Sequence, residues 1–366
     1  MKKKERCRLI LLFSTLAVVV AAIILTLGSA ATVKTEYYDT QVAAARKLEA
    51  CFAAVRDYKK ELGIPMSEDD LHRTGMIGLP YTGITTTQGA LESKRTAAWP
   101  DMAALCVRML YEAGVRPGDT VGAGFSGSFP GMNLAVIAAC ESMGVELVCI
   151  SSVGASTYGA NNPELTFPEM MVRLEEDGFI QTKSAAVTMG GYHDTGADMD
   201  RELAGGIEQR LIEAGLTVMK LPDFEENLEF REALYREKGP ITCFIAVGGN
   251  LTSLGQGEAG VSLGQGVLLP GGNVYLEEGS GLVQRYLAKG IPVINLLNLK
   301  KIMADYSMPY DPVEWPAIGE SGVYTCVLYE KGALAAGFVL SAALLAACRW
   351  LRQPGRSGKG KGPFRK

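Results

Sequence analysis

The hydrophobic positions form two long uncharged runs near the ends of the chain and many short apolar segments between them. Leu9–Leu27 holds 19 residues without a charge, and Gly332–Cys348 holds 17. A helix needs about 20 apolar residues to cross a bilayer core, so we expect a transmembrane helix at each end, the second extending to Trp350. A cleaved signal peptide is the alternative for the first run, and a buried amphipathic helix is the alternative for the second.

Between these runs, from residue 100 onwards, short apolar segments alternate with stretches of helical periodicity. Another helix is expected at Tyr38–Leu62, where apolar residues recur at three- and four-residue steps. Strands that alternate strictly with helices pair in parallel through right-handed crossovers, so the predicted fold is α/β, with a doubly wound, mostly parallel sheet. The predicted strands are 120–125, 146–151, 184–189, 216–220, 241–247 and 291–296, and the predicted helices are 100–113, 130–143, 166–178, 200–214, 227–238 and 280–289.

Basic residues gather at both ends of an otherwise acidic chain. Residues 1–8 sum to +4 and residues 349–366 to +7, whereas the whole chain carries −4, which leaves −15 for residues 9–348. Lys and Arg concentrate on the cytoplasmic side of membrane helices, so we expect a two-pass protein of the cell membrane with both termini cytoplasmic and the acidic domain extracytoplasmic. The expected organisation is a cytoplasmic basic tail (1–8), a transmembrane helix (9–28), a juxtamembrane helix and loop region (29–99), an extracytoplasmic α/β domain (100–331), a second transmembrane helix (332–350) and a cytoplasmic basic tail (351–366).

The composition narrows the possible chemistry. The chain has only two His residues, His72 and His193, and its eight Cys residues form no C-x-x-C pair. His-rich metal sites, zinc ribbons and thioredoxin-type motifs are therefore excluded, and we expect neither a metal nor a cofactor. A nucleic acid is not an expected partner, because the acidic domain repels a polyanion. Most of the Cys residues lie in apolar stretches and are expected to be buried free thiols.

In α/β sheets ligands bind beyond the carboxyl ends of the strands, so the segments that follow the predicted strands are the first candidates for a site. Small and polar residues follow five of them, at 124–130, 151–156, 190–194, 248–250 and 295–298. The hydroxyls of Thr85–Thr87 and the basic pair Lys94–Arg95 suit a carboxylate or a phosphate, with an ordinary solvated loop as the alternative. The expected ligand-binding residues are Thr86, Thr87, Lys94, Arg95, Gly124, Ser126, Gly127, Ser128, Ser152, Ser156, Gly190 and Gly191.

The loop at 122–128 lies between a predicted strand and a predicted helix, and it allows two functional interpretations. It matches neither G-x-G-x-x-G nor a Walker A loop, although the amides at a helix N-terminus bind anions well. It is also one residue away from the G-x-S-x-G nucleophile elbow, which makes Ser126 a candidate nucleophile with His193 and Asp194 as base and acid. The usual elbow order is Ser, acid, His, whereas Asp194 follows His193. A tight βα turn that merely needs glycine is the structural alternative.

Several short motifs between residues 74 and 162 form a recognisable series. They are Thr74–Gly78, Ile84–Thr87, Ser93–Thr96, Glu112–Val115, Gly118–Asp119, Gly124–Pro130, Asn133, Ser151–Ser156, Gly159–Asn161 and Pro163, and the series continues through Ser184–Ala186 and Gly190–Gly191. Through these motifs the chain resembles the membrane-associated "poly-gamma-glutamate system protein" family. Where we would expect an Asn-Pro-Asn-like stretch, this chain has Trp99-Pro100-Asp101. The resemblance implies a role in poly-γ-glutamate synthesis or export at the cell surface, beside the synthetase complex and its polymer, and it adds Asn161 to the expected binding residues.

Two functions of different class follow from these observations. The first is a non-enzymatic, membrane-anchored accessory protein that binds a carboxylate-bearing ligand or a partner subunit through its extracytoplasmic domain. Because the domain is acidic, its contact with a polyanion such as poly-γ-glutamate should be local. The second is a surface serine hydrolase or transpeptidase that acts on γ-glutamyl amide bonds through Ser126.

Overall fold

The computed structural model describes residues 3–256, 263–271 and 274–351. The chain divides into two compact units. One comprises Met1–Lys34 together with Thr325–Lys366, and the other comprises Thr35–Tyr324. The two ends of the chain therefore belong to one unit, and everything between them belongs to the second.

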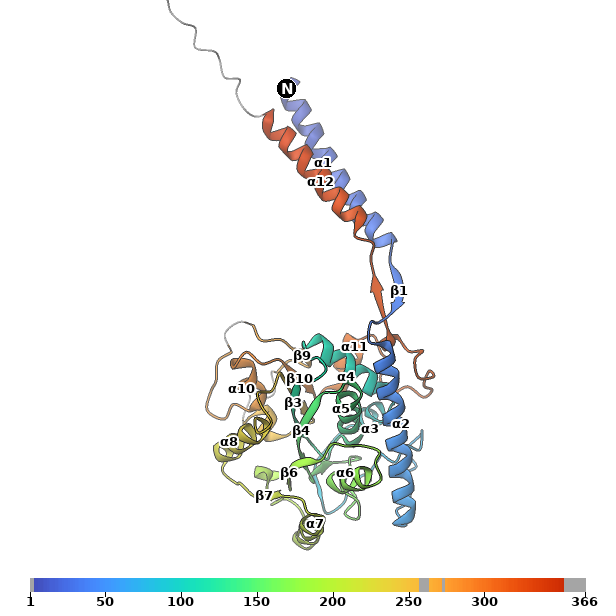
Figure 1. The fold of residues 1–366 in the computed structure, drawn as a ribbon, viewed down its shortest axis with the longest axis vertical. Helices are drawn as coiled ribbons and strands as arrows, with labels where there is room; N and C mark the ends of the chain where they lie inside the picture. The colour runs from blue at the N-terminus through green and yellow to red at the C-terminus, as the bar shows by residue number, and fades with distance from the viewer. Residues whose placement is uncertain (1–2, 257–262, 272–273, 352–366) are drawn as a thin grey trace, which may run out of the picture. The chain divides into compact units, whose positions relative to one another are not determined.

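The first unit is a helical hairpin continued by a two-stranded ribbon. Helices α1 (Lys3–Gly28) and α12 (Gly332–Trp350) lie side by side (Figure 1). Strand β1 (Ala31–Lys34) pairs antiparallel with β11 (Thr325–Leu328). At Gly337 a Cβ atom would stand 2.4 Å from the Cβ atom of Ala22, so the glycine lets the two helices approach closely. Both helices are long and apolar enough to cross a membrane, by length and composition.

The second unit contains a seven-stranded, mostly parallel sheet. Its strand order is β7-β6-β4-β3-β8-β10-β9, and only the edge strand β9 runs antiparallel to its neighbour. The six predicted strands are all present, whereas β9 was not predicted. The strands are β3 (Thr120–Phe125), β4 (Glu146–Ser152), β6 (Ser184–Thr188), β7 (Val218–Met219), β8 (Cys243–Val247), β9 (Gly266–Leu268) and β10 (Val293–Leu296).

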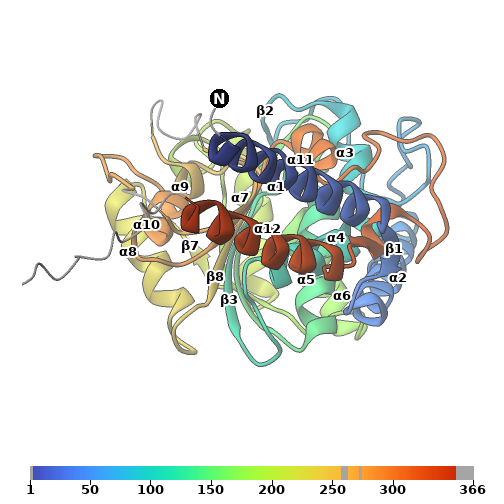
Figure 2. The same ribbon diagram turned by 90° about the horizontal axis from the view of Figure 1, so that it is seen from above.

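Helices cover both faces of this sheet (Figure 2). On β4, Leu147 and Cys149 join the core cluster beneath one set of helices, and Val148 and Ile150 join the cluster beneath the other. Strands buried on both faces are expected to be continuous apolar runs, as these are. One face carries α2 (Tyr38–Glu61), α4 (Asp101–Glu112), α5 (Pro130–Met143) and α6 (Phe167–Glu176), and the other carries α8 (Phe224–Tyr235) and α10 (Leu282–Ala288).

Local sequence signals explain where several helices begin and end. The predicted capping box opens α6, with the Thr166 backbone N–H donating to Glu169 Oε2 at 2.8 Å. Asp200 caps α7 (Arg201–Glu213) by accepting from two backbone N–H groups, and Gly144 ends α5 with φ +67°. The shorter elements are β2 (Thr85–Thr87), α3 (Leu91–Ala97), β5 (Ala155–Ser156), η1 (Tyr192–Asp194), α9 (Leu251–Leu254), α11 (Leu299–Asp305) and η3 (Gly322–Tyr324).

Candidate functional site

The strand order reverses between β3 and β8, and the loops that follow these strands contact each other. Ser126 comes directly after β3, and its backbone N–H donates to the Val247 carbonyl at 3.3 Å. Gly248 follows β8 with φ +80°, and a Cβ atom there would stand 2.8 Å from Cβ of Ser126. A side chain at Gly248 would therefore push the two loops apart. Ligands of open α/β sheets bind beyond such a reversal, so this edge is the first candidate for a site.

The loop after β3 also lies against the segment that follows β4. At Gly127 a Cβ atom would stand 2.6 Å from the carbonyl oxygen of Val153, so glycine is needed for this approach. The two segments are joined by the backbone N–H of Ser156, which donates to Ser128 Oγ at 2.9 Å. Three predicted binding residues, Gly127, Ser128 and Ser156, are thereby brought together.

A lysine from α3 completes this group. The Lys94 side chain is buried, with 3% of the residue exposed. Its Nζ atom donates to the Ser128 carbonyl at 2.6 Å and to Ser156 Oγ at 2.7 Å, and it lies 3.6 Å from the centroid of the Phe129 ring. In the part of the chain that the structure describes, no carboxylate forms an ion pair with Lys94. We call Lys94, Ser128 and Ser156 the lysine–serine cluster.

Burial changes the acid–base behaviour of this lysine. Loss of hydration disfavours the ammonium and lowers the pKa of Lys94 from 10.5 to about 7. Near neutral pH the amine is therefore present in both protonation states. The charged form can bind an anion, and the neutral form can accept a proton.

The neighbouring Arg95 is in a different situation. Its Nε and Nη2 atoms donate to the two carboxylate oxygens of Asp311 at 2.8 and 2.5 Å. These hydrogen bonds raise the pKa of Arg95 and balance its charge within the chain. Of the predicted basic pair, Lys94 has no acidic partner in the described segments, whereas Arg95 is already engaged.

Strand β2 and the segment that follows it lie against the lysine–serine cluster and its neighbours. The Thr86 hydroxyl donates to a carbonyl of β5 at 3.4 Å, and the Thr87 carbonyl accepts from the Thr157 N–H at 3.0 Å. The Gly89 N–H donates to Thr157 Oγ1 at 2.8 Å. A Cβ atom at Gly89 would stand 2.7 Å from Ser156 Oγ, so the chain passes directly above that hydroxyl.

Ser126 contacts the lysine–serine cluster through Ser128, whereas His193 makes its ring contact elsewhere. Ser126 Oγ accepts from the Ser128 N–H at 3.2 Å, and the Ser126 carbonyl accepts from Asn133 Nδ2 at 2.8 Å. His193 is exposed and has φ +51°. Its ring contacts that of Tyr192, and the two ring centroids lie 4.2 Å apart. Among the hydrogen bonds of the described residues, none joins Ser126 to His193. The geometry does not assemble a triad from them.

Asp194, the third predicted catalytic residue, belongs to a buried ion pair. Its Oδ2 atom accepts from Arg231 Nη2 at 2.6 Å and from Asn227 Nδ2 at 3.1 Å, and its Oδ1 atom accepts from the Thr188 hydroxyl at 2.8 Å. The Arg231 side chain is 3% exposed. These contacts hold the loop after β6 against α8, and they occupy both carboxylate oxygens.

The other predicted binding residues make contacts within the chain. Asn161 accepts from the Leu79 N–H at 2.9 Å and donates to the Leu79 carbonyl at 2.8 Å, which fixes the segment before β2. The Ser152 hydroxyl donates to the Phe125 carbonyl at 3.2 Å, at the end of β3. The remaining predicted glycines lie where an added side chain would crowd neighbouring atoms, namely Gly124, Gly190 and Gly191.

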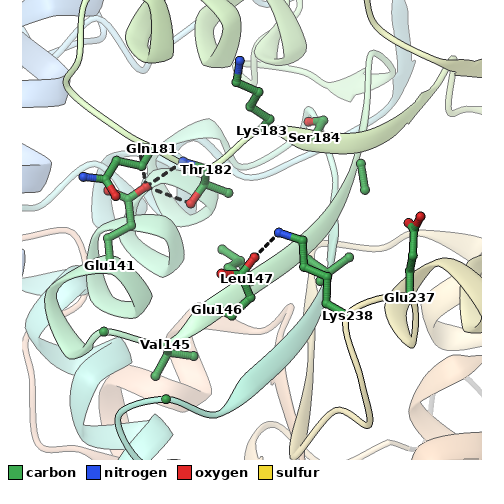
Figure 3. A pocket seen from close by; sticks show the side chains of 14 residues that line it. Glu141, Val145, Glu146, Leu147, Gln181, Thr182, Lys183, Ser184, Glu237 and Lys238 are labelled. Atoms are coloured by element: carbon green, nitrogen blue, oxygen red, sulfur yellow. Dashed lines mark hydrogen bonds and ion pairs between the residues drawn. The ribbon is translucent and has the colours of Figure 1, made fainter.

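A surface pocket of about 810 Å³ lies at the opposite edge of the sheet, where the strands begin (Figure 3). In it, Glu141 accepts from the backbone N–H groups of Gln181 and Thr182, and Glu146 pairs with Lys238. Two of its charged side chains, Glu146 and Lys238, thus pair with each other, and Glu141 is bound by backbone amides and by Lys47. None of the predicted site residues lines this pocket, and we assign the site to the lysine–serine cluster on chemical grounds.

The sequence placed Lys94, Ser128 and Ser156 among separate binding residues, but it did not indicate that they touch. Their contact arises because β5, a two-residue strand, lies against the loop after β3. The burial of Lys94 was also not predicted. One feature of the sequence could have indicated this burial. The run Thr96–Trp99, directly after Lys94 and Arg95, is uncharged and is typical of a buried helix end. Within the described residues, no group of three His, Cys, Asp or Glu side chains could hold a metal ion.

No protein-family model, curated protein or solved structure matches this chain.

Proposed function

We propose that this chain is a membrane-anchored accessory protein of poly-γ-glutamate synthesis or export, whose extracytoplasmic domain binds a carboxylate-bearing ligand or a subunit of the synthetase complex. The pathway rests on the resemblance carried by residues 74–162. The binding chemistry rests on one observation, the buried amine of Lys94 without a carboxylate partner among the described residues.

A buried lysine of this kind favours an anionic ligand. Burial of an unpaired charge costs free energy, and a bound carboxylate offsets that cost by supplying the missing opposite charge. The hydroxyl of Ser156 adds a hydrogen-bond donor beside the amine. One lysine can bind one carboxylate. This agrees with a local contact between the acidic domain and a polyanion, and not with a long polyanion wrapped around it.

The fold supports a ligand site in this position. The strand order reverses between β3 and β8, helices cover both faces, and two members of the cluster, Ser128 and Ser156, follow the carboxyl ends of β3 and β4. These are features of a doubly wound sheet, in which ligands bind at the carboxyl edge.

The helical hairpin supports membrane anchoring. Helices α1 and α12 pack against each other and run antiparallel, as do the strands β1 and β11 that connect to them (Figure 1). The start of α1 and the end of α12 therefore lie at the same end of the hairpin. Together with the +4 and +7 flanks, this favours two membrane passes with both termini cytoplasmic.

Orientation can be tested with a single cysteine at Ser357, which lies outside the described residues, after replacement of the native Cys residues. Protection from a membrane-impermeant thiol reagent on intact cells, with labelling in a lysate, supports a cytoplasmic tail. A matched cysteine at the exposed Glu320 should be labelled on intact cells. Labelling at residue 357 on intact cells would contradict the two-pass arrangement.

Ligand binding can be tested by calorimetry on the detergent-solubilised chain with γ-linked glutamate oligomers. We expect binding that is weakened at least tenfold by Lys94→Met. Lys59→Met is the matched control, because Lys59 is also a buried lysine, 4% exposed, but donates to the Ile77 carbonyl and not to a residue of the cluster. The ligand-binding version is wrong if millimolar oligomer gives no heat, or if both variants bind equally to the native chain.

A further inference from the structure

We propose that Ser156 and Lys94 form a nucleophile–base pair that transfers γ-glutamyl groups, with the Ser156 hydroxyl attacking the amide carbonyl and the Lys94 amine accepting its proton. The substrate class rests on the proposed function, whereas the nucleophile and the base are assigned from the geometry of the cluster. This assignment replaces Ser126 as nucleophile and His193 as base.

The atoms of the pair are placed for proton transfer. Lys94 Nζ lies 2.7 Å from Ser156 Oγ, within the distance at which a base takes a proton. A second hydrogen bond, from Nζ to the Ser128 carbonyl, fixes the direction of the amine. The Ser156 backbone is held in turn by its N–H bond to Ser128 Oγ. The base is thus oriented by a third group, as in other activated serine nucleophiles.

The surroundings of Lys94 make its neutral form accessible near neutral pH. The groups that touch its amine are the uncharged Ser128, Ser156 and Phe129. On its own helix, Glu92 is exposed to solvent and Arg95 is paired with Asp311. With no carboxylate to hold the proton, burial lowers the pKa of Lys94 to about 7, which is the range that a general base needs.

The reaction can be written with its atoms balanced. Ser156 Oγ bonds to the γ-carbonyl carbon while its proton passes to Lys94 Nζ. The ammonium returns that proton to the amide nitrogen as the C–N bond breaks, releasing the amine of the next glutamate and leaving an ester on Ser156. Water or a second amine then attacks the ester, and its proton passes through Lys94 to Ser156 Oγ as the C–O bond breaks.

The pair can be tested without a γ-glutamyl substrate, using a fluorophosphonate probe on the full chain in detergent. We expect an adduct on Ser156, located by mass spectrometry, that is lost in Ser156→Ala and reduced at least tenfold in Lys94→Met. Ser93→Ala is the matched control, because that hydroxyl contacts Tyr310 outside the cluster, and it should label normally. Labelling by the native chain should rise about tenfold per pH unit below pH 7 and level off above it.

Each other result overturns the assignment. An adduct on Ser126, no adduct on the native chain, or labelling without the pH dependence would show that Ser156 is not activated by Lys94. Circular dichroism and thermal unfolding of each variant separate loss of the nucleophile from loss of the fold. Failure here is distinct from failure of ligand binding, because calorimetry of the native chain with γ-linked glutamate oligomers measures binding whether or not an adduct forms on Ser156.

Discussion

Two buried basic side chains pack against the loops at the carboxyl edge of the sheet, and they have different partners. Arg231, on α8, donates to Asp194 and has a side chain that is 3% exposed. Lys94, on α3, is also 3% exposed but contacts only hydroxyl and carbonyl oxygens and an aromatic ring. The two side chains are therefore equally buried, but Arg231 forms an ion pair and the Lys94 amine does not.

The difference distinguishes a buried charge that is neutralised within the fold from one that a ligand can neutralise. A buried ion pair is costly to break, because removal of one partner leaves the other buried without compensation. A buried amine without a partner costs stability, and it can recover that cost by binding an anion or by losing its proton. The residues of the predicted triad therefore divide: Asp194 belongs to the structural pair, and the reactive chemistry lies at Lys94.

The largest expected effect is on stability, at the paired cation. Arg231→Met leaves the Asp194 carboxylate without its cation, and we expect it to lower the free energy of unfolding by about 3–5 kcal/mol. Urea unfolding of the solubilised chain measures this. Lys94→Met should leave the free energy of unfolding unchanged or raise it, since it removes an uncompensated charge. Equal losses in the two variants would contradict the distinction.

The second expected effect is a pH dependence of stability that comes from Lys94. The folded-state pKa of about 7 lies below the unfolded value of 10.5, so above pH 7 the unfolded chain binds a proton that the folded chain does not. Stability should therefore rise with pH, and Lys94 should contribute about 2–3 kcal/mol between pH 7 and pH 9. The difference between the native chain and Lys94→Met isolates this contribution. A difference that stays constant with pH would show that Lys94 is charged throughout.

The third expected effect is on ligand binding. A bound carboxylate favours the ammonium, so binding takes up a proton once the free amine is deprotonated. Affinity for γ-linked glutamate should fall about tenfold per pH unit above pH 7, which is about 1.4 kcal/mol per unit. Fluorophosphonate labelling needs the neutral amine and should not fall over the same range. Calorimetry in buffers of different ionisation enthalpy counts the proton directly, and affinity that is independent of pH would exclude Lys94 from the contact.

Much of the fold could be predicted because its signals are local. The apolar runs of β3 and α5 and the capping box of Thr166 fix those elements without reference to distant residues. Strand β9 was not found because its three residues, Gly266–Leu268, carry too little periodicity to distinguish a strand from a loop. Its antiparallel pairing with β10 depends on contacts far apart in sequence.

The site was less predictable, because its chemistry depends on pairings between segments. In the sequence, Lys94 and Arg95 are simply two adjacent basic residues. Only the position of Asp311 in the fold shows that Arg95 is paired and that Lys94 is not paired with it. Asp194 was assigned to catalysis because it follows a histidine after a strand, yet Arg231, 37 residues later, determines its role. Sequence order identified the edge of the sheet that carries the polar residues, but not which of them are satisfied by each other.

The smallest expected effect is at His193, and it tests whether this histidine, and not Lys94, is the base. His193→Asn keeps a residue type that tolerates φ +51° and changes an exposed side chain, so the free energy of unfolding should shift by less than about 0.5 kcal/mol. Probe labelling should also be unchanged if Lys94 is the base. A histidine acting as the base for Ser126 would instead make the variant lose labelling about 10²-fold or more, because general-base catalysis contributes on that order. Since Lys94 lies on α3 and His193 in η1, and the two contact different residues, one labelling series with Lys94→Met and His193→Asn assigns the base to one of them. Loss in His193→Asn with retention in Lys94→Met would return the reactive chemistry to the loop after β6 and make Lys94 a binding residue only.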